Sequence, residues 1–231
     1  MRSVVAWLVV CPLLGALLGS PAADAIIARH GVASAPAEAR LNDQMVPAGR
    51  LANGVLTVAL DLTRATWRPN GPDGVAIDVA AIAERGQAPP VPGPLIRVPE
   101  GTRVEASVRN LLDSVAVVRG LREHDGGNDS LVLAPGAEQL VRFTASRVGT
   151  HFYLARITRT PTLLSRRDDS LLVAALVVDP APRTARAPMR PERIWVITAW
   201  DDSGRVAHSL YGPRQVYAIN GRSWPHTERL T

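Results

Sequence analysis

Apolar and polar residues alternate in short runs along most of the chain. Within the run 103–109, Val104, Ala106 and Val108 alternate with charged residues and a serine. A period of two places the apolar side chains on one face of a β-strand and leaves the other face wet. Glycine, proline and other turn residues separate similar runs at 54–62, 75–83, 95–98, 115–118, 131–133, 139–145 and 149–157. After residue 25 no stretch shows a long helical period, although a short helix at 75–83 is an alternative to a strand. The pattern predicts an all-β sandwich or barrel.

The later part of the chain differs from these alternating runs. Residues 171–178 are continuously apolar, which is typical of one strand that is buried on both faces. An Arg/Pro/Ala-rich segment follows, and further strands are then predicted at 194–200 and 217–221. Because two strands cannot bury a core by themselves, they either extend the sheet of the first domain or begin a second domain.

The first 25 residues have the pattern of a signal peptide. Arg2 precedes an apolar stretch at 4–18 that is too short for a membrane span, and Ala-Asp-Ala at 23–25 fits a cleavage site. An earlier site at 20–22 is the alternative. We therefore expect export to the periplasm or the medium, with a mature chain that begins near Ile26 and has no membrane anchor. Cys11, the only cysteine, leaves with this peptide, so the mature chain has no disulfide and no thiolate ligand.

The chain of 231 residues is basic, with a net charge of +5, and all 26 of its basic residues are arginines. A nucleic-acid-binding surface would combine clustered basic residues with interleaved aromatic residues. No arginine cluster in this sequence alternates with aromatic residues. We therefore interpret the charge as a solvated surface and expect no nucleic-acid partner.

Residues 91–110 predict a strand, a turn and a second strand, with the run Pro-Gly-Pro-Leu-Ile-Arg-Val at 92–98. Further motifs follow at 100–101, 108–110, 134–136, 141–144, 149–153, 171–179, 193–201 and 218–229. In this order, the motifs resemble the first plastocyanin-like (cupredoxin) domain of multicopper oxidases and the start of the second. The resemblance covers about residues 45–231. It implies a cupredoxin-like Greek-key β-sandwich or barrel with a short C-terminal β extension.

The predicted organisation follows from the resemblance and the signal peptide. It has a signal peptide at 1–25, an irregular N-terminal arm at 26–45, a cupredoxin-like domain at 46–182, a linker at 183–192, and the first strands of an incomplete second cupredoxin domain at 193–231.

The resemblance also implies copper chemistry. Multicopper oxidases take electrons from a substrate at a mononuclear copper and reduce dioxygen at a trinuclear cluster. Their first domain normally supplies two His-x-His pairs to that cluster. At the matching positions this sequence has Val117 and Arg119, and then Leu154 and Arg156. A permanent positive charge would repel Cu²⁺, so we expect copper by family resemblance only and not in this chain alone.

The five histidines of the chain are widely spaced. His124 and His151 are nearest in sequence to the replaced positions. A rebuilt metal site could combine them with Glu123 and Asp125, although surface or packing roles are more usual for isolated histidines.

Three functional hypotheses follow from the sequence. The first is an exported, non-catalytic cupredoxin-like module that binds another cupredoxin domain or chain. The second is the N-terminal part of a multicopper oxidase, an oxidoreductase that acts only with a downstream copper-binding domain or partner. The third is a truncated product without an independent function. We expect the chain alone to be inactive as an oxidase.

Overall fold

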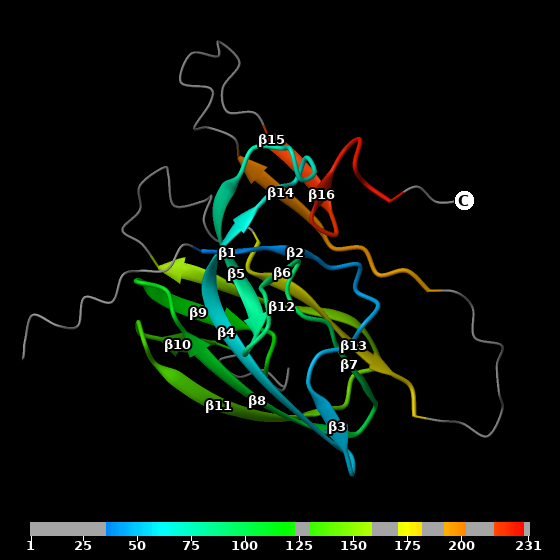
Figure 1. The fold of residues 1–231 in the computed structure, drawn as a ribbon. Coiled ribbons are helices and arrows are strands. Elements are labelled where there is room, and N and C mark those ends of the chain that lie inside the picture. Colours follow the sequence, from blue (N-terminus) through cyan, green and yellow to red (C-terminus); the bar gives the residue numbers. More distant parts are fainter. Residues whose placement is uncertain (1–35, 123–129, 159–170, 182–191, 202–214, 229–231) are drawn as a thin grey trace, which may run out of the picture. The chain divides into compact units, whose positions relative to one another are not determined.

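The computed structural model describes residues 36–122, 130–158, 171–181, 192–201 and 215–228, and these residues form strands, turns and loops without a helix (Figure 1). The described residues all belong to one compact unit. The all-β prediction is confirmed, and the segment for which a helix was the alternative contains strand β5 (Ile77–Glu84). The same ranges hold no helix that is long and apolar enough to cross a membrane.

The first sheet is built around the long strand β4 (Val55–Trp67). β4 pairs in parallel with β8 (Thr102–Asn110), and β8 pairs in an antiparallel manner with β11 (Glu138–Ala145). β3 (Arg50–Ala52), β5 and β1 (Ala37–Glu38) also pair with β4, which gives six strands in the described residues. We call this the β4 sheet.

The second sheet has five strands in the order β10-β9-β12-β13-β7. Their bounds are β7 (Ile96–Pro99), β9 (Val115–Arg119), β10 (Leu131–Leu133), β12 (Gly149–Thr158) and β13 (Val173–Asp179). All its pairs are antiparallel except that of β13 with β7. We call this the β12 sheet.

The main core is formed by the inward faces of these two sheets. Every second residue of β8, from Val104 to Val108, is buried in one cluster with every second residue of β4, β9, β11 and β12. The period-two alternation therefore assigns the buried face correctly. β13 is buried on both faces, because its other side packs with Leu95 and Ile194. This confirms the interpretation of the continuous apolar run.

The stretch 91–110 forms the predicted strand, turn and strand, but the two strands do not pair with each other. β7 joins the β12 sheet and β8 joins the β4 sheet. The turn between them contains Gly101, whose φ of +83° lies in the left-handed region that glycine adopts without strain. This short link therefore carries the chain from one sheet to the other, as in a sandwich with crossed connections.

The C-terminal strands β14 (Ile197–Asp201), β15 (Gln215–Ile219) and β16 (Arg222–Ser223) form a sheet of their own. They do not extend a sheet of the first domain by hydrogen bonding. One face of this sheet packs on the end of β4, where the rings of Trp67 and Trp200 meet edge to face at 6.5 Å. The indole of Trp67 also donates a hydrogen bond to the carbonyl of Gly221 at 2.8 Å.

The arm predicted to be irregular at 26–45 contains two short strands in its described part. β1 pairs with β4, and β2 (Arg40–Leu41) pairs in parallel with β6 (Pro90–Val91). Strands of two residues are too short to show a hydrophobic period, which explains why the sequence pattern did not predict them. The predicted signal peptide and most of the predicted linker lie outside the described residues.

Candidate functional site

The strands that carry the predicted ligand positions are direct neighbours in the β12 sheet. β9 and β12 run antiparallel, and in their register Val117 lies opposite Arg156 while Arg119 lies opposite Leu154. Directly opposed residues of antiparallel strands share one face of the sheet. The structure therefore brings all four positions together, and we call this group the β9–β12 block.

The β9–β12 block faces away from the main core. The side chains that alternate with it on the same two strands point inward and are buried. Val117 and Leu154 are half-buried, whereas Arg119 and Arg156 are exposed. Among the residues that the structure describes, neither arginine forms an ion pair with a carboxylate.

The side chains of the block do not fit a copper ion. Copper in proteins is held by imidazole, thiolate and related donors, and valine and leucine offer no donor atom. The guanidinium group of arginine keeps its proton in proteins and has no lone pair to give. Two cations in one block also repel Cu²⁺.

A close backbone contact fixes the strand pair beside the block. Gly120 directly follows β9, and its φ is +84°. A Cβ at this position would lie 2.4 Å from the carbonyl oxygen of Phe152 and 2.8 Å from the Cα of Tyr153. Only glycine satisfies both the backbone angle and the space. The close approach of the chain after β9 to β12 therefore requires glycine at position 120.

The segment Pro92-Gly93-Pro94 supports the same strand from the inside. A Cβ at Gly93 would lie 3.0 Å from the Cβ of Ala174 and 3.1 Å from that of Ile82, so glycine allows β13 and β5 to approach here. The hydroxyl of Tyr153 on β12 donates a hydrogen bond to the carbonyl of Pro94. Burial raises the pKa of Tyr153 well above its ordinary value, so this phenol stays protonated.

His151 does not share the face of the β9–β12 block. It lies at the start of β12, in the alternation of Tyr153 and the other inward residues, and its Nε2 is 2.8 Å from the carbonyl oxygen of Arg147. His124, Glu123 and Asp125 lie outside the described residues. Within the described ranges there is no group of three or more His, Cys, Asp or Glu side chains that could hold a metal ion.

The outer face of the β12 sheet is covered at one end and open at the other. At β13, Ala175 and Val177 pack with Ile194 and the half-buried Val196, so the segment before β14 covers them. Around the β9–β12 block the same face carries exposed apolar side chains, including Phe152, which is 62% exposed, and Val132 on β10, which is 58% exposed. The block thus lies in an apolar surface that the described residues leave open.

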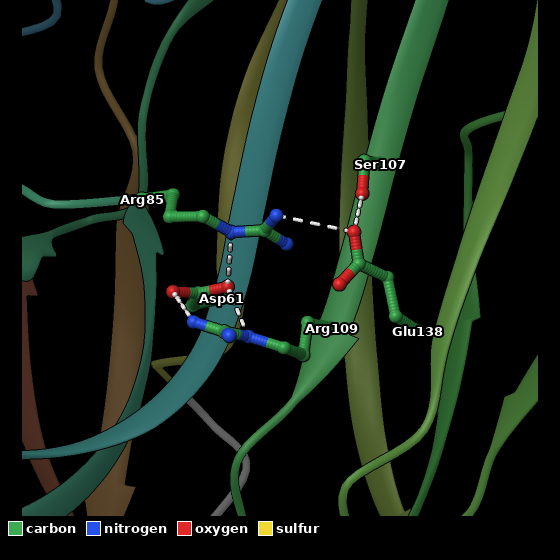
Figure 2. Close-up of polar contacts among 5 residues, drawn as sticks. All are labelled: Asp61, Arg85, Ser107, Arg109 and Glu138. Atoms are coloured by element: carbon green, nitrogen blue, oxygen red, sulfur yellow. Dashed lines mark hydrogen bonds and ion pairs between the residues drawn. The ribbon is translucent and has the colours of Figure 1, made fainter.

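On the outer face of the β4 sheet, by contrast, charged side chains pair with one another (Figure 2). Asp61 on β4 is buried, and it accepts hydrogen bonds from Arg109 on β8 at 2.9 and 3.1 Å and from Arg85 at 3.1 Å. Arg85 also reaches Glu138 on β11 at 3.1 Å, and Ser107 donates a hydrogen bond to the same carboxylate. We call these five residues the Asp61 network.

The pKa shifts in the Asp61 network follow from its pairing. The hydrogen bonds from Arg109 to Asp61 raise the pKa of that guanidinium above its ordinary value. The pKa of Glu138 is lowered, first by the hydrogen bond from Ser107 and then by Arg85. Sequence reasoning did not single out this network, because only the alternation of charged residues along β8 hinted at a wet face.

The chain is similar to known copper proteins in fold. No family model matches the chain. A probable nitrite reductase-hydroxylamine oxidoreductase fusion protein of Kuenenia stuttgartiensis is 33% identical in an alignment of 90 residues that covers 35% of this chain and 11% of the relative. The blue copper oxidase from Nitrosomonas europaea superposes with a TM-score of 0.55 at 21% identity, over 74% of this chain and 55% of the other. The multicopper oxidase mgLAC has a TM-score of 0.54 at 20% identity, over 75% and 56%.

The matches span only part of these proteins. The chain covers a little over half the length of both solved oxidases and 11% of the curated relative. A third structure, described as a multicopper oxidase, has a TM-score of 0.53 at 19% identity and is covered over 64% of its length. Likeness at this identity establishes the fold. The chain therefore has the cupredoxin fold of multicopper oxidase domains, as its ordered motifs predicted.

Proposed function

We propose that this chain is an exported cupredoxin-fold module, related to multicopper oxidases, that acts as a binding scaffold and does not carry out copper oxidation alone. One observation carries the proposal. The four positions at which the family resemblance places copper ligands meet as two directly opposed pairs, and they hold two aliphatic side chains and two arginines. The strand pair that would present a metal cluster is there, whereas these four side chains offer no donor atom.

The surface around the block supports a binding role. A patch that combines exposed Phe152, Val132 and half-buried Leu154 with two arginines resembles the composition of protein interfaces, in which aromatic residues and arginine are enriched. The partner is another cupredoxin domain or chain, with an apolar face and carboxylates that pair with Arg119 and Arg156. Burial of these arginines without such partners would be costly.

A second candidate is an N-terminal part of a larger oxidase that works only with further cupredoxin domains. The sheet β14-β15-β16 favours it, because Ile197 and Tyr217 are 63% and 60% exposed on the face opposite the one that packs on β4. A small sheet that is apolar on both faces is typical of a layer that a further layer covers. In that arrangement the present chain still supplies no copper donor from the β9–β12 block.

Copper titration of the purified mature chain tests the proposal. We expect no stoichiometric tight binding of Cu²⁺ and no blue absorption band. As a positive test, a variant with Val117→His, Arg119→His, Leu154→His and Arg156→His places four imidazoles on one face of a strand pair. We expect this variant to bind Cu²⁺ stoichiometrically and far more tightly than the natural chain, because four imidazoles replace side chains that offer no donor atom.

The matched control carries asparagine at the same four positions. Asparagine removes the two charges as histidine does, but it is a poor copper ligand, so the control should bind Cu²⁺ as weakly as the natural chain. Tight stoichiometric binding by the natural chain would contradict the non-catalytic proposal. If the histidine variant folds and gains no affinity over the asparagine control, the assignment of the β9–β12 block as the family's ligand position is wrong.

A further inference from the structure

A large cavity lies away from the β9–β12 block, where the arm and the C-terminal sheet meet the first domain. Its volume is about 800 Å³, which is within the range of small-molecule sites. Its walls come from three separate parts of the sequence. They are residues 40–48 at the end of the arm and just after it, the segment 84–94 that includes β6, and the C-terminal residues 193–195 and 219–228.

Specific hydrogen bonds hold the walls of the cavity in place. On the arm, the side-chain amide of Asn42 donates to the carbonyls of Pro92 and Gly93 at 3.1 and 2.9 Å. On the C-terminal side, Asn220 donates to the carbonyl of Ile194 at 3.0 Å and accepts from the backbone N–H of Val196 at 2.9 Å. The cavity is therefore formed before any ligand binds, which lowers the cost of binding.

The arm and the C-terminal turn also touch directly beside the cavity. A Cβ at Gly221 would lie 2.3 Å from the carbonyl oxygen of Val91 on β6 and 3.3 Å from Leu41 on β2. Gly221 has a φ of +81° and belongs to the two-residue turn between β15 and β16. Arg40 precedes Leu41 on β2 and Arg222 follows Gly221 on β16, and both arginines line the cavity.

Some charged side chains that line the cavity have partners within the chain, and others do not among the described residues. Arg193 pairs with Glu228 at 3.2 Å. Glu84 accepts the backbone N–H of Gly49, and Asp43 accepts that of Met45, both at 3.0 Å. By contrast, the described residues supply no ion pair or hydrogen bond to the side chains of Arg40 and Arg222.

An apolar wall lies in the same cavity as these two arginines. Trp195 is 49% exposed and Val46 is 77% exposed, and Ile219 completes this side. Exposed tryptophan rings stack on flat groups, and the guanidinium of arginine forms paired hydrogen bonds with carboxylates. A ligand that fits both features has a flat apolar body and one carboxylate.

We propose that this cavity binds a small organic monocarboxylate with a planar apolar body, held by Arg40 and Arg222 and stacked against Trp195. The three acidic residues Asp43, Glu84 and Glu228 line the same cavity and oppose a ligand with several negative charges. This excludes nucleotides and other polyphosphates as the preferred ligands. The inference is independent of the scaffold role, because none of the four positions of the β9–β12 block lines the cavity.

Calorimetric titration of the purified mature chain with indole-3-acetate tests the inference. We expect saturable binding with a Kd of about 1 mM or tighter, the range of a ligand of this size. Indole-3-acetamide has the same body without the charge, and ATP carries several charges. We expect each to bind at least about tenfold more weakly, because a charge-assisted hydrogen bond is lost or the acidic residues repel.

Substitution separates the cavity from the general positive charge of the chain. Arg40→Gln and Arg222→Gln should each weaken indole-3-acetate binding about tenfold. Arg147→Gln removes the same charge from an exposed position outside the cavity, and binding should stay within about twofold. All three side chains are exposed, so thermal melting should show unchanged folding.

Three results would overturn the inference. One is the absence of saturable binding up to 10 mM, a concentration about ten times the expected Kd. Another is equal binding of the acetate and the acetamide, which would remove the arginines from the recognition. The third is an equal loss of affinity in Arg147→Gln and Arg222→Gln, which would assign binding to the net charge of the chain. A copper-binding result for the β9–β12 block changes none of these outcomes.

Discussion

The outer faces of the two sheets differ in how their arginines are paired. Both sheets bury their inner residues in one core, and both carry arginines outside. On the β4 sheet the arginines find carboxylates of the same chain, as the Asp61 network shows (Figure 2). On the β12 sheet, Arg97 on β7 likewise pairs with Asp179 on β13 at 2.7 Å. In the β9–β12 block, however, Arg119 and Arg156 have no carboxylate among the described residues, and the same face carries the exposed Phe152 and Val132.

The carboxylate of Asp61 already has its partners, whereas the face around the β9–β12 block still has binding capacity. A buried carboxylate between two arginines is satisfied, and another molecule would have to break these bonds to use them. Exposed arginines beside exposed apolar groups keep their hydrogen-bond donors for a partner. The scaffold role proposed above therefore belongs to the β12 sheet, and the charged face of the β4 sheet contributes to stability.

Among substitutions on the outer faces of the two sheets, the largest expected effect comes from breaking the Asp61 network. Asp61→Ala leaves Arg85 and Arg109 without their shared carboxylate, and breaking such a pair typically costs about 3 kcal/mol of the free energy of unfolding. The side chains of Arg85 and Arg109 are 32% and 35% exposed, so water replaces the lost carboxylate only in part. Urea denaturation monitored by circular dichroism measures the change.

Asp78→Ala is the matched control for that prediction. Asp78 on β5 pairs with Arg64 on β4 at 2.7 Å, but its side chain is 56% exposed. The loss at an exposed pair should stay below about 1 kcal/mol. If the two variants lose the same free energy, burial does not distinguish the Asp61 network from an ordinary surface pair.

The sequence pattern predicted which face of each strand is buried, but not which charged side chains pair across strands. The period of two placed Val104, Ala106 and Val108 in the core, and by the same alternation it left Arg109 on the wet side. The pairing of Arg109 with Asp61 joins residues 48 positions apart. Such a pair depends on the register of β4 with β8, and no local sequence pattern encodes that register.

For the candidate sites, too, the sequence identified single residues but not their arrangement. The resemblance named Val117, Arg119, Leu154 and Arg156, but only the register of β9 with β12 shows that they form opposed pairs. The cavity combines three distant parts of the chain, so no motif could have predicted it. One missed element did have a local signal, because Asn53-Gly54, with φ values of 51° and 73°, forms the two-residue turn that pairs β3 with β4.

A second, smaller effect tests the open face. The double variant Arg119→Ala/Arg156→Ala should change the free energy of unfolding by less than about 0.5 kcal/mol, because exposed side chains without partners contribute little. Relief of repulsion between two cations in one block could even stabilise the chain slightly. Urea denaturation at low and high salt measures both terms.

Phe143→Ala provides the contrast on the other side of a sheet. Phe143 on β11 is 8% exposed in the main core, and its loss should cost about 3–5 kcal/mol. A loss above about 1 kcal/mol in the arginine double variant would show that these side chains stabilise the fold itself. The interpretation of the open face as free binding surface would then be wrong.

The smallest expected effect is a pH dependence that Glu138 should give to the outer face of the β4 sheet. The pKa of Glu138 is lower in the folded chain than its ordinary value, first because of Ser107 and then because of Arg85. A lowered pKa means that Glu138 stabilises the fold above its unfolded pKa of about 4.3. This contribution is lost as the pH falls through the lower, folded pKa. The free energy of unfolding of Glu138→Gln should therefore fall less steeply between pH 6 and pH 3 than that of the natural chain.

Glu100→Gln, at an exposed glutamate that no arginine contacts within the described residues, should keep the natural slope. Equal slopes in the natural chain and both variants would show that the outer face of the β4 sheet gains nothing from this ion pair.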